Sequence, residues 1–301
     1  MNADRFIKSF PSLTTVHLTM MKDDQILASG TGFFYDVDGY PYLVTNRHNL
    51  TGRHQETDKP LDEDGRIPNS LQIQQPIVTQ NGNVFTFDGT QLNILTLRWD
   101  PNAPAWKEHP ELGSCADVVA FDLWAVKPIF PRPLFCVNTI SGLSNLLVEP
   151  GHQVSVIGYP YGKSVGGHLP IWVNGTLASE PGFNIDDKPL MYIDCRTNKG
   201  SSGSPVFATA PIGLVTTEGE PNFRKQGMSI SHENGNVTTT SSFLRYRFLG
   251  VYSGRINNEA DIGYLWRVQT VDEVCRNPEF VFQRDKLQID PDFKMDVFPN
   301  S

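Results

Sequence analysis

A serine, a histidine and an aspartate stand in separate parts of this chain, each in a setting that suits nucleophilic chemistry. Ser202 lies in the stretch CRTNKGSSGSPV, His48 in YLVTNRHNLTG, and Asp117 opens the apolar stretch DVVAFDL. A serine hydroxyl is a weak nucleophile at neutral pH, so it needs a base within hydrogen-bond reach and a carboxylate that orients the base. The three residue types therefore predict acyl-transfer chemistry if the fold brings them together.

Each of these residues also has a plain structural interpretation. An aspartate at the start of a hydrophobic strand can simply cap that strand, and Asp122, five residues later, is a second candidate carboxylate. A histidine taken alone is more often a surface or hydrogen-bonded structural residue than a catalyst. His48 stands out because it follows an apolar strand at a turn, whereas the other histidines lie inside a strand or in polar stretches: His17, His54, His109, His152, His168 and His232.

The elements that must position these residues are almost all predicted strands. Short β-branched or aromatic runs alternate with turns rich in Gly, Pro, Asn and Asp, a pattern typical of barrels and sandwiches. The proline-rich segment KPIFPRPLF cannot form a central strand and is predicted to connect two β domains; the clearest helical segment is 271–277. The predicted strands are 14–21, 25–37, 40–46, 83–89, 92–99, 117–126, 152–162, 169–179, 189–195, 204–209, 244–254 and 262–271.

Composition narrows the class of protein. The chain has 301 residues, a net charge of −8 and no basic run, which argues against nucleic acid or an anionic membrane as partner. The beginning MNADRFIKSFPSL lacks an apolar signal segment, and four widely spaced cysteines match no zinc pattern. We therefore expect a cytoplasmic protein with free thiols and neither a metal nor a cofactor, with two disulfides as the alternative that an even number of cysteines permits.

Several stretches, in this order, resemble the trypsin/chymotrypsin-type serine peptidases. They are TGFF, YLVTNRHN, ADVVAF, VSVIGYPYG, IWVNGTLAS, GSSGSPVF, LGVYSG and IGYLWRV, and together they span about residues 14–270. Within the family the sequence is most similar to the bacterial intracellular and high-temperature-requirement branch. The resemblance implies an all-β fold of two six-stranded antiparallel barrels of the chymotrypsin type, followed by a short C-terminal helix and tail.

The resemblance also implies a domain division and a role for each site residue. Residues 1–130 would form the barrel carrying His48 and Asp117, 131–150 a connector, 151–271 the barrel carrying Ser202, and 272–301 the helix and tail. In the family pattern G-x-S-G-x-P, Ser202 is the nucleophile, with His48 as base and Asp117 as orienting acid. The amides of Gly200 and Ser202 would form the oxyanion hole.

The primary substrate pocket is the least determined part of the site. In the family, the residue six before the nucleophile lies at the pocket floor, which here is Arg196, and Arg255 passes the pocket mouth. A buried guanidinium there would select Asp or Glu in the substrate, whereas an outward Arg196 would leave a small neutral pocket. The pocket residues expected on this basis are Arg196, Thr197, Ser253, Gly254, Arg255 and Gly263.

The sequence also departs from the digestive members of the family. Ser201 replaces the aspartate that pairs with a freed N-terminal amine, so the activation switch of those enzymes is not expected, and a regulatory partner is one alternative. The expected function is a serine endopeptidase acting on proteins or peptides through an acyl-enzyme. An inactive peptide-binding module and an esterase are the alternatives, because the same three residues serve several reactions.

Overall fold

The computed structural model describes most of the chain between residues 6 and 278. The described residues are 6–7, 9–81, 84–100, 103–123, 134–140, 142–166, 169–211, 232–233, 236–237, 244–257 and 261–278. The tail from 279 onward and most of the predicted connector KPIFPRPLF lie outside them. In the part described, no helix combines the length and the apolar character needed to cross a membrane.

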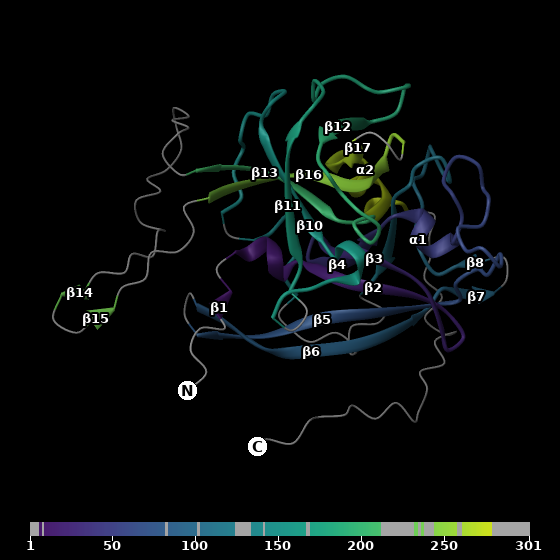
Figure 1. Ribbon diagram of the computed structural model, residues 1–301, viewed down its shortest axis with the longest axis horizontal. Coiled ribbons are helices and arrows are strands. Elements are labelled where there is room, and N and C mark those ends of the chain that lie inside the picture. The colour runs from purple at the N-terminus through teal and green to yellow at the C-terminus, as the bar shows by residue number, and fades with distance from the viewer. Residues whose placement is uncertain are drawn as a thin grey trace, which may run out of the picture.

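The second half of the chain forms a closed antiparallel barrel of six strands, in the order β10-β11-β12-β17-β16-β13. It occupies the upper part of the view in Figure 1. Buried side chains, most of them aliphatic but including Tyr252, fill its interior in one cluster. The strands are β10 (Gln153–Gly158), β11 (Ile171–Leu177), β12 (Leu190–Asp194), β13 (Pro205–Pro211), β16 (Leu244–Arg255) and β17 (Ile262–Arg267).

The first half forms a seven-stranded antiparallel sheet in the order β1-β6-β5-β2-β3-β4-β9. This differs from the expected six-stranded barrel, because β1 covers the outer edge of β6 and no strand pair among the described residues joins β9 to that edge. The strands are β1 (Phe6–Ile7), β2 (Thr15–Lys22), β3 (Gln25–Val37), β4 (Tyr40–Thr45), β5 (Ser70–Asn81), β6 (Val84–Thr96) and β9 (Val119–Asp122).

The long ribbon of β5 and β6 runs along the lower side of the molecule in Figure 1. The sequence did not predict β5, because its polar glutamines and Pro76 do not look like a strand. The pairing explains how the proline is accommodated: β2 pairs only with Ser70 to Gln74, so the nitrogen of Pro76 lies beyond the end of that ladder. The two strands predicted at 83–89 and 92–99 are largely one strand, β6, which bulges opposite Ile77 and Val78.

The helices among the described residues are few and short. The helix α1 (Arg47–Thr51) follows β4 and carries His48, and α2 (Val268–Arg276) follows β17 directly. The predicted helix at 271–277 is therefore confirmed, although it begins at Val268 because β17 ends at Arg267. The remaining short elements are η1 (Phe10–Leu13), η3 (Pro160–Gly162), β7 (Arg98–Asp100), β8 (Ala103–Pro104), β14 (His232–Glu233) and β15 (Asn236–Val237).

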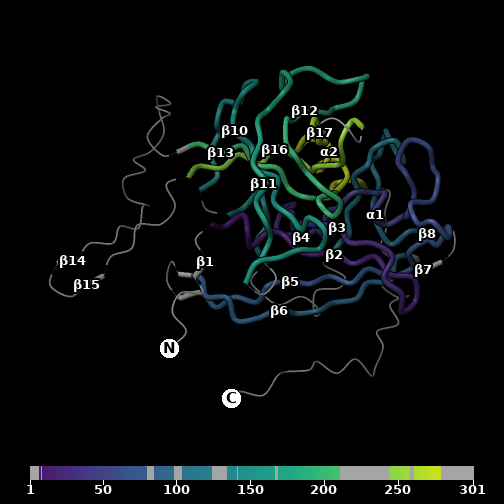
Figure 2. Tube along the Cα trace, viewed as in Figure 1, coloured from purple at the N-terminus to yellow at the C-terminus, as the bar shows by residue number. Residues whose placement is uncertain are grey.

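One hydrophobic cluster joins the two halves. It contains Phe33 and Val44 from the first sheet, Phe207 and Val251 from the barrel, and Val271 from α2, all with no exposed surface. The tube in Figure 2 shows β2, β3 and β4 lying between the barrel and the β5–β6 ribbon. The ends of β4, β9, β13 and β16 therefore meet between the two halves, and the candidate site lies there.

Candidate active site

His48 and Asp117 are brought into direct contact. His48 lies in the first turn of α1, and Asp117 lies two residues before β9, which pairs with β4. The Nδ1 atom of His48 is 2.6 Å from Oδ2 of Asp117, and the backbone N–H of His48 donates to Oδ1 at 2.9 Å. A carboxylate bonded in this way fixes the orientation of the ring and leaves Nε2 for another partner.

Asp117 is almost completely buried, at 1% exposure, and further groups surround it. The hydroxyl of Ser253 donates to Oδ2, and the side-chain amide of Asn46 donates to the backbone carbonyl of Asp117 at 2.7 Å. Burial, and then the negative charge of Asp117, raises the pKa of Tyr264 to about 12. A buried carboxylate is stable only with such donors, so these contacts explain how Asp117 is held.

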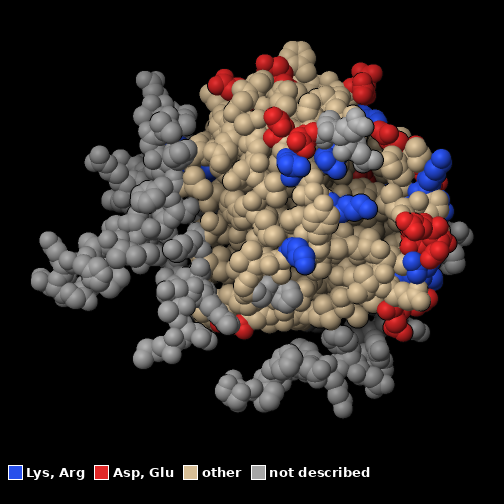
Figure 3. Space-filling view, in the orientation of Figure 1, with Lys and Arg blue, Asp and Glu red and all other residues tan. Residues whose placement is uncertain are grey.

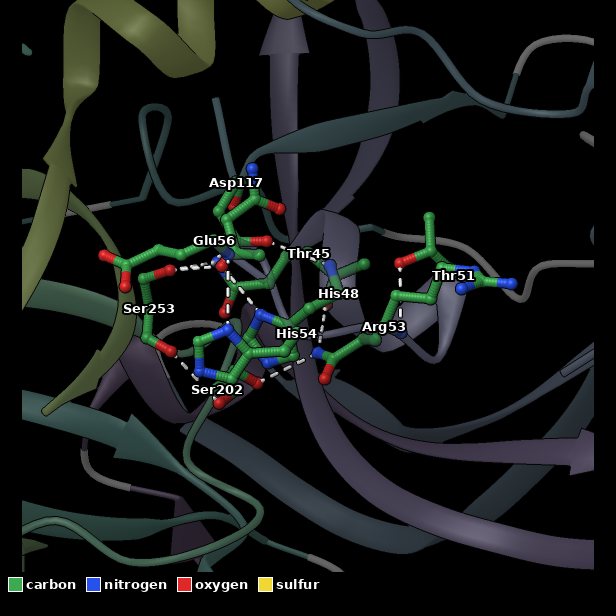
Figure 4. Close-up of polar contacts among 12 residues, drawn as sticks. Thr45, His48, Thr51, Arg53, His54, Glu56, Asp117, Ser202 and Ser253 are labelled. Carbon is green, nitrogen blue, oxygen red and sulfur yellow. Dashed lines mark hydrogen bonds and ion pairs between the residues drawn. The ribbon is translucent and has the colours of Figure 1, made fainter. Parts of the chain in front are cut away.

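Ser202 lies on the other side of the His48 ring, as Figure 4 shows. In this structure its hydroxyl donates to the backbone carbonyl of Ser253 at 3.2 Å. Among the described contacts, no hydrogen bond joins the Ser202 hydroxyl to the ring of His48. The structure thus brings the three predicted residues together, with the serine turned toward β16.

The turn that presents Ser202 depends on its two glycines. Gly200 has φ +92° and Gly203 has φ +86°, in the left-handed region that favours glycine. A Cβ atom on Gly200 would overlap the carbonyl oxygen of Tyr159, and one on Gly203 would overlap the carbonyl oxygen of Thr31. The stretch GSSGSP is therefore a tightly packed turn and not a flexible linker.

Thr31, which has no exposed surface, attaches this turn to the first half of the chain. Its N–H donates to the carbonyl of Ser202 at 2.9 Å, and its hydroxyl donates to the carbonyl of Gly200 at 2.8 Å. The same hydroxyl accepts from the N–H of Tyr159 at 3.1 Å, and the carbonyl of Thr31 accepts from Thr45 at 2.7 Å. The sequence analysis did not identify Thr31, because only the fold reveals that β3 passes this turn.

The amides expected to form the oxyanion hole have no acceptor in the described part of the protein. The N–H groups of Ser201, Gly203 and Ser204 all donate to backbone carbonyls, whereas those of Gly200 and Ser202 do not. The carbonyl of Lys199 accepts from the N–H of Tyr161 at 2.5 Å, which fixes the peptide before Gly200. Two free donors beside a serine can bind a negatively charged oxygen.

The expected pocket residues differ in how deeply they are buried and in where their side chains are directed. Arg196 is exposed, so its guanidinium does not form a buried pocket floor, and Arg255 is partly exposed. Thr197 and Gly263 are buried, and Gly254 is partly buried. The hydroxyl of Ser253, expected in the pocket, is directed instead to Asp117.

Tyr252 is a residue of this region that the sequence analysis did not identify. It is 2% exposed, and its hydroxyl shares a hydrogen bond with that of Thr197. The signal that could have identified it is the family-like stretch LGVYSG, which contains both Tyr252 and Ser253.

The other candidates for the base and for the orienting carboxylate have partners away from Ser202. His17 contacts Ser29 at 2.7 Å, and His109 contacts Glu273 at 2.8 Å. Asp122 pairs with Tyr42 in the sheet, at the far end of β9 from His48. Within the described ranges, no group of three His, Cys, Asp or Glu side chains is placed to hold a metal ion.

Comparison with known protein families gives one match. A family model described as the trypsin-like peptidase domain matches residues 30–211, more than half of the chain. No curated protein matches the chain.

Similar solved structures are serine proteases of low identity. The Rv3671c protease from M. tuberculosis in its active form is 15% identical, with 88% of this chain and 80% of that chain covered and a TM-score of 0.40. The thermostable serine protease AL20 from an extremophilic microorganism is 12% identical, with 88% and 96% covered and a TM-score of 0.44. The range matched by the family model includes His48, Asp117 and Ser202 and spans more than half of the chain. This protein therefore belongs to the trypsin-like peptidase family and is a serine protease.

Proposed function

We propose that the protein is an endopeptidase that cleaves peptide bonds through an acyl-enzyme formed on Ser202. His48 accepts the proton of the Ser202 hydroxyl as the oxygen attacks the carbonyl carbon of the substrate, and Asp117 stabilises the resulting imidazolium. The amides of Gly200 and Ser202 bind the developing oxyanion. His48 then returns the proton to the leaving amine, and a water molecule activated by the same ring hydrolyses the ester.

The observation that carries the proposal is the 2.6 Å contact between His48 Nδ1 and Asp117 beside the two free amides. The reaction needs one local change, since the Ser202 hydroxyl now donates to Ser253. Rotation about its Cα–Cβ bond would turn the hydroxyl toward Nε2 of His48. Catalytic hydrogen bonds are often long or misaligned before substrate binds, so this position is compatible with the mechanism.

The proposed substrates are proteins or peptides, and the proposed location is the cytoplasm. Charges of both signs are scattered over the face shown in Figure 3, and neither sign forms a continuous field there. The net charge of −8 likewise favours a polypeptide substrate over nucleic acid or an anionic membrane.

A fluorophosphonate probe tests the nucleophile directly, because it reacts with an activated serine. We expect wild-type protein to gain one adduct on Ser202 and to hydrolyse peptides, and Ser202→Ala to lose both. His48→Ala should lose nearly as much, with kcat falling by about 10⁶-fold where the three residues act as a unit. Intact-mass analysis and a peptide assay measure these two results.

Ser201→Ala is the matched control, since Ser201 precedes the nucleophile and is 1% exposed. It should still be labelled and active. Labelling of Ser201 in place of Ser202 would contradict the assignment. Labelling with ester cleavage but no peptide cleavage would identify an esterase, and peptide binding without labelling an inactive module.

A further inference from the structure

The space beside Ser202 is bounded by two parts of the barrel. The segment 195–202 leads into the nucleophile, and β16 carries Ser253, whose carbonyl accepts the hydrogen bond from Ser202. Strand β17 lies next to β16, with Gly263 paired to Arg255. The pocket residues expected from the family resemblance, Thr197, Gly254 and Gly263, lie on these segments, so we place the nearest side chain of a substrate bonded to Ser202 between them.

The ring of Tyr252, which belongs to the buried cluster of the barrel, borders this space. Its hydroxyl is hydrogen-bonded to that of Thr197, which lies in the segment leading to Ser202. A Cβ atom on Gly263 would lie only 2.6 Å from Cε2 of Tyr252 and 3.1 Å from its hydroxyl oxygen. The ring therefore extends from β16 across Gly263 to Thr197, and the room that this glycine leaves is taken by the tyrosine.

The buried walls formed in this way are neutral. The positive charge of Arg255 acts on Tyr252, but Arg255 is partly exposed and is not buried with it. Burial raises the pKa of Tyr252 to about 12, so its hydroxyl stays protonated at neutral pH and remains bonded to Thr197. Arg196 is exposed and does not place a charge in this space. A long or charged substrate side chain would meet an aromatic ring and no buried partner of opposite charge.

We propose that Tyr252 closes the inner part of the primary pocket and that the enzyme cleaves after small neutral residues, such as glycine, alanine and serine. This inference rests on the proposed function and specifies its substrate. Tyr252 acts here as a specificity-determining residue, and Thr197 holds its ring in place.

A set of fluorogenic peptides that differ only in the residue before the scissile bond tests the proposal. With Gly, Ala, Leu, Phe, Asp or Lys at that position, we expect kcat/KM for Ala to exceed that for Leu or Phe by about 10- to 100-fold, the discrimination typical of a pocket too small for extra methylenes. Tyr252→Ala should raise kcat/KM for Phe relative to Ala by about tenfold or more, because it removes the ring.

Two control variants separate pocket size from other effects. Tyr252→Phe keeps the ring and should keep the preference for small residues, and Tyr40→Ala removes a tyrosine that is 46% exposed on β4 and should leave the profile unchanged. If Tyr252→Ala does not fold, Tyr252→Leu replaces the ring with a smaller aliphatic side chain. The cleavage profile of the wild-type enzyme tests the preference for small residues without any variant.

The fluorophosphonate adduct distinguishes failure of this inference from failure of the proposed function. A labelled, active enzyme that prefers Leu, Phe, Asp or Lys, or whose profile does not change in the folded Tyr252→Ala or Tyr252→Leu variant, overturns the pocket proposal alone. An enzyme that is not labelled and cleaves none of the peptides overturns the proposed function and this inference with it.

Discussion

Asp117 shows how single residues are arranged to keep a charge inside this protein. An isolated carboxylate at 1% exposure would be strongly unfavourable, but three donors reach its oxygens: the N–H and ring of His48 and the hydroxyl of Ser253. Ser253 also presents its carbonyl to Ser202. One residue of β16 thus contacts both Asp117 and Ser202, which positions these two residues relative to each other.

The four cysteines differ strongly in their surroundings, although all are free thiols. Burial, followed by the nearby Asp194 and Asp261, raises the pKa of Cys195 to about 11. Burial likewise raises the pKa of Cys275 well above its usual value, whereas Cys115 is exposed. Only the thiolate reacts with alkylating agents, so a raised pKa protects a thiol at neutral pH.

We therefore predict that iodoacetamide modifies native protein once at pH 7.5, at Cys115, without loss of peptidase activity. Intact-mass analysis and peptide mapping measure the adducts. Reaction of Cys195 should increase only as the pH approaches 11, where its thiolate forms. Protein unfolded in denaturant should gain four adducts and serves as the control, whereas a second adduct on native protein at pH 7.5 would contradict the prediction.

At the scale of elements, the turn 200–204 and strand β3 form one unit. The hydroxyl of Thr31 donates to the carbonyl of Gly200 and accepts from the N–H of Tyr159, so it holds the Gly200–Ser201 peptide, which lies between the two peptides whose amides should face the oxyanion. Thr31→Val keeps the shape but removes this hydroxyl, leaving the Tyr159 N–H without its acceptor. A lost buried hydrogen bond is worth about 1 kcal/mol or more, and 1.4 kcal/mol is a factor of ten.

We predict that Thr31→Val lowers kcat by about tenfold or more with little change in KM, while Thr31→Ser retains activity. Steady-state kinetics and the rate of fluorophosphonate labelling measure the effect. Thr14→Val is the matched control, because Thr14 is buried and its hydroxyl bonds to Pro11 away from the site. It should lower the melting temperature without changing kcat. An equal loss of kcat in both valine variants would mean that Thr31 has only a structural role.

The strands were predictable from sequence where local patterns decide the structure. Strand β3 was predicted with the bounds it has, because turn residues end its alternating pattern at Asp38 and Gly39. Strand β5 could not be predicted, since it is defined by pairing with β2 and β6 and not by its own composition. The same limit applies to the site: motif order indicated Ser202, whereas the contacts of Thr31 with Gly200 and of Tyr252 with Thr197 are created only by the fold.

At the scale of the whole molecule, α2 connects the last strand of the barrel to the first half of the chain. The ammonium group of Lys107 donates to the carbonyl of Cys275 at 2.9 Å, and Tyr35 donates to Asp272 at 3.3 Å. Burial lowers the pKa of Lys107, and its ammonium lies 4.9 Å from the centre of the Tyr42 ring. The two halves are therefore held together around the site by a helix that follows it in sequence.

The contacts that hold the turn around Ser202 bear on how the enzyme is activated. In the digestive relatives, a freed N-terminal amine pairs with an aspartate just before the nucleophile. Here that position is Ser201, which is 1% exposed, and its hydroxyl has no hydrogen-bond partner among the described residues. The turn is held instead by Thr31 and by the contact between Tyr161 and Lys199.

We predict that the enzyme is active without a free N-terminal amine, so a folded N-terminal fusion should leave kcat/KM unchanged.

Ser201→Asp should destabilise the protein by several kcal/mol, because it buries a carboxylate without a counter-charge, whereas Ser201→Asn, of similar size, should destabilise it less. Burial without a partner raises the pKa of a carboxyl group, so the destabilisation by Ser201→Asp is full at neutral pH and decreases as the pH falls and the group is protonated. Melting temperatures of the two variants between pH 7 and about pH 4 measure this difference, which should narrow at the lower pH. Activity that appears only after removal of the fusion, or a Ser201→Asp variant as stable as Ser201→Asn at neutral pH, would show that a cationic partner reaches this position after all.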